Sequence, residues 1–338
     1  MTDARVLVVG WPSVLHGEAT AGDVLAMRTV EHALSGAGIR HDTAWSRVMC
    51  PPGGLILDDA EPGLYSHLVF ACGPATGTPL VELHERFAHC TRFAIGVSVI
   101  DPADPAVTGF HRVFARDRLG SPPLPDLAAV APMTPEARLP PVLGVFLTAG
   151  QREYGARRRH DEVKDTLVTW LPRVDAGRLD LDTRLDPRDW RLPASPEQLQ
   201  SVIRRLDAVV TMRMHGLVLA LRAGVPAIAL DPVEGGGKVT AQARALGWPA
   251  VLAAAEVSES ALDHQLAWCL SEGRAVAGQV ASWMGSGRGE GNDGPERAAQ
   301  RAEHPVVDQH FSDSGPINSV ADPVNAGLSK LIHHLQSD

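Results

Sequence analysis

The sequence contains little that is typical of small disulfide-bonded, zinc-binding or membrane-spanning proteins. Only four of its 338 residues are cysteines, and no two of them form a CxxC pair, so neither a zinc knuckle nor a redox pair is indicated. No apolar run approaches the roughly 20 residues that a transmembrane helix needs. The first residues, MTDARVLVVGWPSV, lack the separate charged, apolar and cleavage regions of a signal peptide. We therefore expect a cytoplasmic protein without a membrane span.

An excess of positive charge is also absent. Asp and Glu outnumber Lys and Arg by 40 to 31, which gives a net charge of −9. Such a chain has no overall field that would hold nucleic acid or an anionic membrane surface. We expect no nucleic-acid partner, and an anionic substrate would have to be held by a local group of arginines. The 338 residues, 44% of them hydrophobic, suffice for two cores of ordinary size.

What the sequence does contain is an alternation of apolar strand-like runs and amphipathic helix-like segments. The valine-rich run at 5–11 is typical of a central parallel strand. A helix with apolar residues at helical spacing is predicted at 24–38, and further buried strands at 67–73 and 92–101. Strands that alternate with helices favour right-handed βαβ units and a parallel sheet.

Proline interrupts this alternation in the middle of the chain. The proline-rich stretch 121–141 predicts a boundary between an N-terminal Rossmann-like domain, 1–138, and a C-terminal one, 139–285. The Gly-, Asp- and Pro-rich residues 286–322 predict a flexible segment, and 323–338 a short closing helix. The expected fold class is α/β, with two Rossmann-like domains that face each other across a ligand cleft.

One junction in the second domain carries both a strong cation and a titratable side chain. The apolar run that ends at Thr211 leads into Arg213, His215 and Gly216, where a strand ends and a helix begins. In an open α/β sheet this position faces the ligand crevice, and the free N–H groups of a helix N-terminus favour an anion there. Arginine grips a carboxylate or phosphate with two hydrogen bonds, histidine exchanges a proton near neutral pH, and glycine allows close backbone approach. An anion site with an acid beside it is one interpretation; a cap, an ion pair or crevice filling is the other.

The stretch around this junction resembles the C-terminal signature of the polysaccharide pyruvyl transferase family. That signature joins an apolar strand to Arg-x-His-Gly, a helix, a Gly-Val-Pro strand start and a lysine before the next helix. The residues that match it in order are Arg213, His215, Gly216, Gly224, Val225, Pro226 and Lys238. Weaker similarity upstream covers a Gly-Asp loop at Gly22 and Asp23, the loop in LVFACGPATG, and an Arg-Asp step at Arg116 and Asp117.

The resemblance implies a GT-B-like pair of domains and the transfer of pyruvate from phosphoenolpyruvate onto two sugar hydroxyls, which forms a cyclic ketal. The methylene carbon of enolpyruvate must receive a proton before a hydroxyl attacks the adjacent carbon, and His215 would be that acid. Arg213 and Arg116, one from each domain, would converge across the cleft and hold the carboxylate and phosphate. No metal or cofactor is expected, because arginines can neutralise the charge. The other matching positions that we assign to substrate binding are Lys238, Gly22 and Asp23.

The chain departs from the family pattern where the second domain opens. It has Thr148-Ala-Gly in place of the family's arginine, and Arg152 or the Arg157–Arg159 run could supply the missing charge; the alternative is a solvated charged loop. The segment EGGGK, 234–238, either cradles phosphate with backbone N–H groups or is a flexible turn that carries the lysine. Asp23 either activates an acceptor hydroxyl or caps the helix that follows it.

We therefore expect a transferase that moves a pyruvyl group from phosphoenolpyruvate onto hydroxyls of a glycan precursor or another small hydroxylated metabolite. Two alternatives stay open: a GT-B-type glycosyltransferase that uses a nucleotide sugar, and a non-catalytic anion-binding protein of the same fold. Stabilisation of the fold by phosphoenolpyruvate or by nucleotide sugars would separate them.

Overall fold

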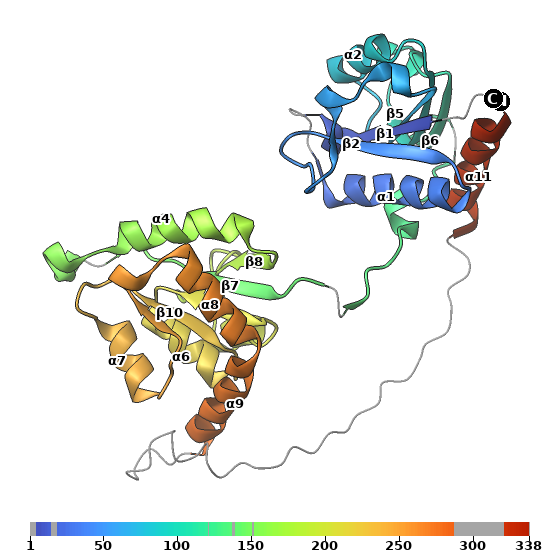
Figure 1. Cartoon of the computed structure of the whole chain (residues 1–338). Coiled ribbons are helices and arrows are strands. Elements are labelled where there is room, and N and C mark those ends of the chain that lie inside the picture. The colour runs from blue at the N-terminus through green and yellow to red at the C-terminus, as the bar shows by residue number, and fades with distance from the viewer. Residues whose placement is uncertain are drawn as a thin grey trace. The chain divides into compact units, whose positions relative to one another are not determined.

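The chain forms two compact units, each built around its own parallel sheet (Figure 1). The computed structural model describes residues 5–14, 19–120, 122–136, 139–150, 152–286 and 321–337. The first unit runs to Thr134 and includes the C-terminal helix, and the second begins at Pro135. The segment predicted to be flexible, 286–322, lies almost entirely outside the described residues. None of the described helices is long and apolar enough to cross a membrane.

The sheet of the first unit has six parallel strands in the order β3-β2-β1-β4-β5-β6. This is the strand order of the Rossmann fold, with the change of winding direction between β1 and β4. The strands are β1 (Arg5–Gly10), β2 (Arg40–Trp45), β3 (Leu55–Ile56), β4 (His67–Ala71), β5 (Thr91–Val99) and β6 (Arg112–Arg118). The helices are α1 (Ala21–Gly36), α2 (Thr78–Arg86), α3 (Pro105–Thr108) and the closing helix α11 (Ala321–Ser337).

Both faces of this sheet are covered, which explains the continuous apolar run in β1. Val6 and Val8 pack on one face with Met27 of α1, whereas Leu7 and Val9 pack on the other with Leu80 of α2. These four consecutive side chains of β1 are at most 1% exposed. Successive strand residues point to opposite faces, so a strand that is buried on both sides needs an apolar residue at every position.

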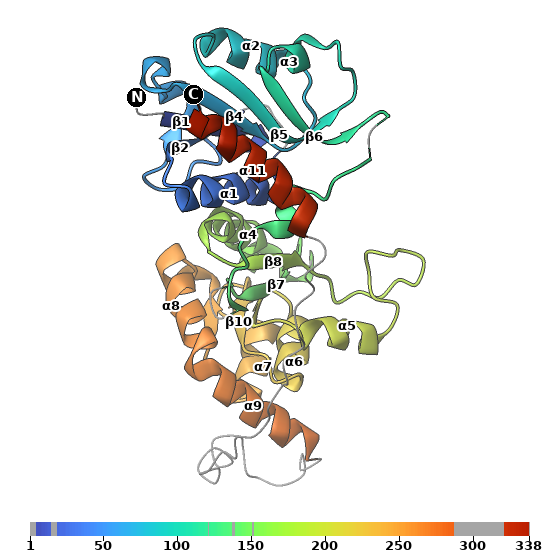
Figure 2. The same ribbon diagram turned by 90° about the vertical axis from the view of Figure 1, so that its right-hand side faces the viewer.

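The chain ends on the first unit, far in sequence from the strands that it contacts. Helix α11 runs beside α1 (Figures 1 and 2) and also contacts β5. Its apolar stripe of Leu328, Leu331 and Leu335 is buried in the cluster that contains Val6 and Val8. The leucine spacing is that of one face of a helix, so α11 completes the core of this unit.

The second unit has five parallel strands in the order β11-β10-β9-β7-β8. The strands are β7 (Val142–Phe146), β8 (Gly177–Asp180), β9 (Ala208–Thr211), β10 (Ala227–Asp231) and β11 (Val251–Ala253). The helices are α4 (His160–Trp170), α5 (Pro196–Ile203), α6 (Met214–Arg222), α7 (Lys238–Ala245), α8 (Glu259–Leu270) and α9 (Glu272–Gly285). The prediction of two Rossmann-like α/β domains is confirmed by the two sheets.

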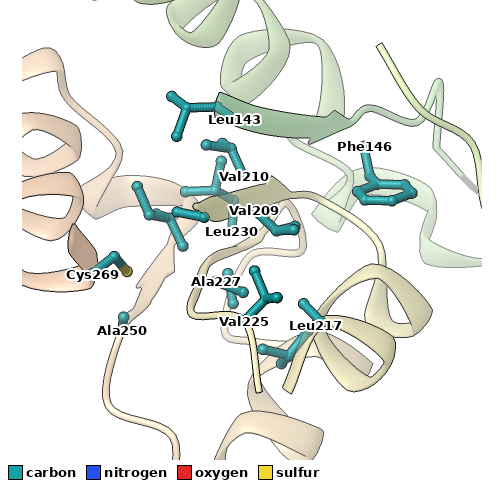
Figure 3. Packing of buried hydrophobic residues seen from close by; sticks show 14 of the residues in the cluster. Leu143, Phe146, Val209, Val210, Leu217, Val225, Ala227, Leu230, Ala250 and Cys269 are labelled. Carbon is teal, nitrogen blue, oxygen red and sulfur yellow. The ribbon is translucent and has the colours of Figure 1, made fainter. Parts of the chain in front are cut away.

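The core of the second unit lies between the central strands and the helices that cover them. Figure 3 shows Leu143 of β7, Val209 and Val210 of β9, and Ala227 and Leu230 of β10 packed together. These five side chains are fully buried. Because the strands at the centre are rigid, the loops at their carboxyl ends can hold polar side chains in fixed positions.

Helix α5 illustrates how local sequence fixes an element of this unit. Ser195 precedes Pro196, and its side chain accepts a hydrogen bond from the backbone N–H of Gln198 at 3.4 Å. We expect Ser195→Ala to lower the free energy of unfolding by about 1 kcal/mol, since an unpaired N–H is then left at the helix start. Urea unfolding measures this change. Ser201→Ala on the same helix is the control and should stay within about 0.5 kcal/mol of the parent protein; equal losses would contradict the capping role.

Candidate functional site

A polar pocket lies at the carboxyl edge of the second sheet. In this sheet the first strand along the chain, β7, has β8 on one side and β9 on the other. Ligands in open α/β folds bind at such a change of winding direction. The pocket holds about 660 Å³, part of it open to solvent. It is lined by Thr148, Tyr154, His160, Thr183, Met212, Arg213, Met214, His215, Asp231, Pro232, Val233, Lys238 and Val239.

Three helices begin at this pocket. Its lining includes the first residues of α4, α6 and α7, which are His160, Met214 and Lys238. The residues that precede α4 and α6, Arg159 and Arg213, offer no side-chain acceptor to their helices. The N–H groups of a first helical turn and the helix dipole favour an anion. The backbone alone therefore makes the pocket attractive to a carboxylate or phosphate.

Arg213 is fixed at both its backbone and its side chain. The Thr211 hydroxyl accepts a hydrogen bond from the Arg213 N–H at 2.9 Å and donates one to the Arg213 carbonyl at 3.0 Å. The guanidinium Nε donates to the Leu147 carbonyl at 2.9 Å, and Nη1 lies 3.5 Å from Oδ1 of Asp182. These contacts use only part of the five N–H donors of an arginine. The side chain is thus oriented in advance, which reduces the entropy lost when it binds an anion.

Gly216 is required by the packing of α6 against β9. A Cβ atom at this position would lie 2.2 Å from the Thr211 hydroxyl oxygen and 3.4 Å from Cβ of Phe146. The close backbone approach at Gly216 is thus one between the helix and the strand, and an approach of this backbone to a bound anion stays a prediction. His215, the residue before Gly216, lies in the first turn of α6, where it is exposed and lines the pocket.

Asp231 organises the loop that leads to Lys238. Its fully buried carboxylate accepts hydrogen bonds from the backbone N–H groups of Val233 at 3.1 Å, Gly237 at 2.6 Å and Thr240 at 2.8 Å. The Gly237 N–H is therefore used by the protein itself, and the choice between a phosphate cradle and a turn that carries the lysine stays open for the other N–H groups of EGGGK. Asp231 was missed from the sequence, although an aspartate at a strand end before a glycine-rich loop is a usable signal.

The arginine run after β7 contacts protein groups. Arg158 donates to the Ala149 carbonyl at 2.7 Å and lies 3.0 Å from a carboxylate oxygen of Asp161. Arg159 lies 2.7 Å from a carboxylate oxygen of Glu234, and its backbone N–H donates to the Pro232 carbonyl at 2.8 Å. The run thereby joins the β7–α4 loop to the β10–α7 loop. Nothing is described of the Arg152 side chain, so its predicted role in anion binding stays a prediction.

His160 is a second pocket histidine that the sequence did not reveal. It is 3% exposed and is the first residue of α4. Burial lowers the pKa of its imidazole below the usual value, and the positive charge of Arg158 acts in the same direction. The available signal was its place at the helix start after the first strand of the second domain.

Three predicted site residues, Gly22, Asp23 and Arg116, lie in the first unit. Asp23 is 7% exposed and forms a capping box with Thr20: its carboxylate accepts from the Thr20 N–H at 2.9 Å, and the Thr20 hydroxyl accepts from the Asp23 N–H at 3.2 Å. Helix α1 begins at Ala21, earlier than the predicted start at 24, so its N-cap is Thr20; Asp23 is the third residue of the helix and completes the capping box from inside it. A role for Asp23 and the adjacent Gly22 in substrate binding stays a prediction. Arg116 on β6 donates to Asp117 at 3.0 Å and also forms an ion pair with Asp126.

The structure thus brings together three of the predicted site residues, Arg213, His215 and Lys238, around one pocket. Arg116 belongs to the other unit, so its convergence with Arg213 stays a prediction.

A comparison with models of known protein families tests the resemblance that the sequence indicated. A family model described as polysaccharide pyruvyl transferase matches residues 113–232, which confirms the resemblance over that stretch. The match includes Arg116, Arg213 and His215, and it ends before Lys238. No curated protein matches the sequence.

Several solved structures are similar to the chain at low identity. The Escherichia coli heptosyltransferase WaaC with ADP-2-deoxy-2-fluoro heptose is 14% identical, covers 78% of this chain and 99% of its own, and has a TM-score of 0.26. The Methanocaldococcus jannaschii UDP-GlcNAc 2-epimerase in complex with UDP-GlcNAc and UDP is 10% identical. It covers 84% of this chain and 100% of its own, and has a TM-score of 0.29. The spinosyn forosaminyltransferase SpnP is 15% identical, covers 88% of this chain and 98% of its own, and has a TM-score of 0.29. Similarity at this level says nothing about substrate or chemistry.

Proposed function

We propose that this protein moves a pyruvyl group from phosphoenolpyruvate onto two hydroxyls of a glycan precursor or another small hydroxylated metabolite, in the cytoplasm. The observation that carries the proposal is the single pocket in which Arg213, His215 and Lys238 meet at the starts of helices. The match to the pyruvyl transferase family over residues 113–232 supports the same reaction class.

The chemistry assigns a distinct task to His215. Its proton goes to the methylene carbon of enolpyruvate, which becomes a methyl group and leaves positive charge on the adjacent carbon. One acceptor hydroxyl attacks that carbon, and its proton restores His215. The bond from the carbon to the phosphate oxygen breaks with its electron pair on phosphate, and the second hydroxyl attacks the same carbon, giving its proton to the departing phosphate. The products are a cyclic ketal and inorganic phosphate.

The other pocket groups hold the anionic donor. Arg213 is fixed by the Leu147 carbonyl and by Asp182, and it stands at the start of α6. Its planar guanidinium can bind a carboxylate through two hydrogen bonds. Lys238 is the first residue of α7, directly after the loop that Asp231 holds, and it lines the same pocket. Together with the helix N-termini, these cations offset the absence of an arginine at Thr148.

Replacement of Arg213 tests the anion site. Arg213→Lys is expected to weaken phosphoenolpyruvate binding by about 1.5–3 kcal/mol, because an ammonium group cannot reproduce the planar two-pronged contact. Isothermal titration calorimetry on the full chain measures the loss. Arg222→Lys, at the exposed end of the same helix, is the matched control and should bind as the parent does. Unchanged binding by Arg213→Lys would remove Arg213 from the donor site.

A further inference from the structure

The pocket contains a buried imidazole with a ring nitrogen that has no hydrogen-bond partner among the described residues. His160 is 3% exposed, and its Nδ1 atom is buried without a hydrogen-bond partner among the described residues. Leaving a buried polar nitrogen unpaired costs on the order of 1–3 kcal/mol. Buried polar atoms are rarely left in this state unless a ligand or another function requires it. His160 also lines the pocket with Arg213, His215 and Lys238.

A second buried histidine shows what a structural imidazole looks like in this protein. His84 on α2 is 8% exposed, its Nε2 atom lies 3.0 Å from the Ala106 carbonyl, and its ring meets Phe110 edge-on with 4.4 Å between centroids. The Nδ1 atom of His84 is also buried without a hydrogen-bond partner among the described residues, but its Nε2 atom is bonded to a carbonyl and its ring packs against an aromatic side chain. His160 has no such carbonyl contact among the described residues, and it borders a cavity instead.

The loop before α4 leaves room for the His160 ring and fixes it. Tyr154 stacks on it with 6.4 Å between ring centroids and 28° between planes. Gly150 has a φ of +95°, and a Cβ atom there would lie 2.8 Å from Cγ of His160 and 2.6 Å from Nε of Arg158. Only glycine satisfies both the backbone angle and this close approach. The ring is therefore held in place before any ligand arrives.

The charges around His160 favour its neutral form. Burial is the main cause that lowers the pKa of the imidazole, and Arg158 and Lys238 add to it, whereas Asp161 and Asp231 oppose it. Its position at the start of α4 acts in the same direction as burial, because the helix dipole disfavours a cation there. A neutral imidazole has one N–H donor and one acceptor. At a helix N-terminus such a ring can donate to an anion without carrying a charge itself.

We propose that His160 is a further ligand-binding residue, which donates its ring N–H to a phosphoryl oxygen of the bound ligand and forms a phosphate subsite with Lys238 and the N-terminus of α4. Arg213 and His215, at the start of α6, face the rest of the ligand. The identification of that ligand as phosphoenolpyruvate rests on the proposed function, whereas the phosphate subsite itself does not. The subsite lies in the second unit alone.

Calorimetric titrations of the full chain with inorganic phosphate and with phosphoenolpyruvate test the subsite. His160→Phe fills the space of the ring without its nitrogens, and His160→Leu is a second variant without the bulk of a phenyl ring. Both are expected to bind inorganic phosphate about 10- to 100-fold more weakly, as for a lost hydrogen bond to a charged group. The matched control, His84→Phe, replaces the other buried histidine and should bind phosphate as the parent does. Cooperative thermal unfolding identifies the variants that are folded.

The outcomes separate this inference from the proposed function. Phosphate binding that is unchanged in a folded His160 variant, or absent from the parent protein at millimolar phosphate, overturns the subsite. An equal loss in His84→Phe also overturns it, because the effect would then be structural. Phosphate binding that depends on His160, without binding of phosphoenolpyruvate, supports the subsite and contradicts the proposed donor.

Discussion

Replacing His215 with Gln is expected to lower turnover about 10²–10⁴-fold, while the protein still folds and still binds phosphoenolpyruvate. His215 is exposed in the first turn of α6 and lines the same pocket as Arg213, whose guanidinium is fixed by the Leu147 carbonyl. Glutamine keeps a hydrogen-bonding side chain but has no proton to give to a carbon atom. The measurement is the release of inorganic phosphate from phosphoenolpyruvate in the presence of a hydroxylated acceptor.

His264 provides the control for this experiment. It is exposed on α8, outside the residues that line the pocket, and His264→Gln should leave turnover unchanged. Full activity in His215→Gln would show that another group supplies the proton. A loss of phosphoenolpyruvate binding as large as the loss of turnover would instead assign His215 to binding.

Asp231→Asn should lower the free energy of unfolding by about 3 kcal/mol or more, and it should also abolish binding of phosphoenolpyruvate. The carboxylate accepts three backbone N–H groups, from Val233, Gly237 and Thr240, in a fully buried position. An asparagine would turn an N–H₂ group toward donors and would leave buried N–H groups unsatisfied. Because these bonds define the turn before Lys238, the start of α7 would move with them.

Urea unfolding and calorimetry together test this role of Asp231. Asp165→Asn, on the exposed face of α4, makes the same chemical change without such contacts and should stay within about 0.5 kcal/mol of the parent protein. A stability of Asp231→Asn within that same range would show that the loop is held by other contacts. Intact binding in a destabilised Asp231→Asn would separate the loop from the donor site.

The sequence predicted the parts of the site that depend on local pattern. The step from β9 to α6 combines a fully buried strand, a glycine and a helical apolar pattern within a few residues. Arg213 lies between the two elements and His215 lies in the first turn of α6, so their position follows from the strand-to-helix step alone. Asp23 was predicted to cap a helix for the same reason, since the two partners of a capping box are only three residues apart, although the N-cap itself is Thr20.

The partners of these residues could not be predicted, because strand order is not contained in the local pattern. Arg213 donates to Leu147, which is 66 residues away, and pairs with Asp182 after β8. These contacts exist only because β7 lies beside both β8 and β9. His160 likewise reaches the pocket through the start of a helix that follows another strand.

Some elements were missed because their own sequences are ambiguous. The strand β2, RHDTAW, has one fully buried residue and polar side chains at its start, so it lacks the apolar run of a central strand. Helix α9 contains Gly273, Gly278 and Gly285, and glycine lowers helix propensity by about 1 kcal/mol per residue. Its packing on α6 and α8 stabilises it in the fold.

The identity of the donor is the central claim, and thermal unfolding of the unmodified chain tests it most directly. A ligand that binds only the folded protein raises its stability, by about 2.7 kcal/mol at a hundred times its Kd. We predict that phosphoenolpyruvate raises the melting temperature in a saturable way, and that members of a panel of nucleotide sugars do not. Stabilisation by a nucleotide sugar, with no effect of phosphoenolpyruvate, would contradict the account and would indicate a glycosyltransferase.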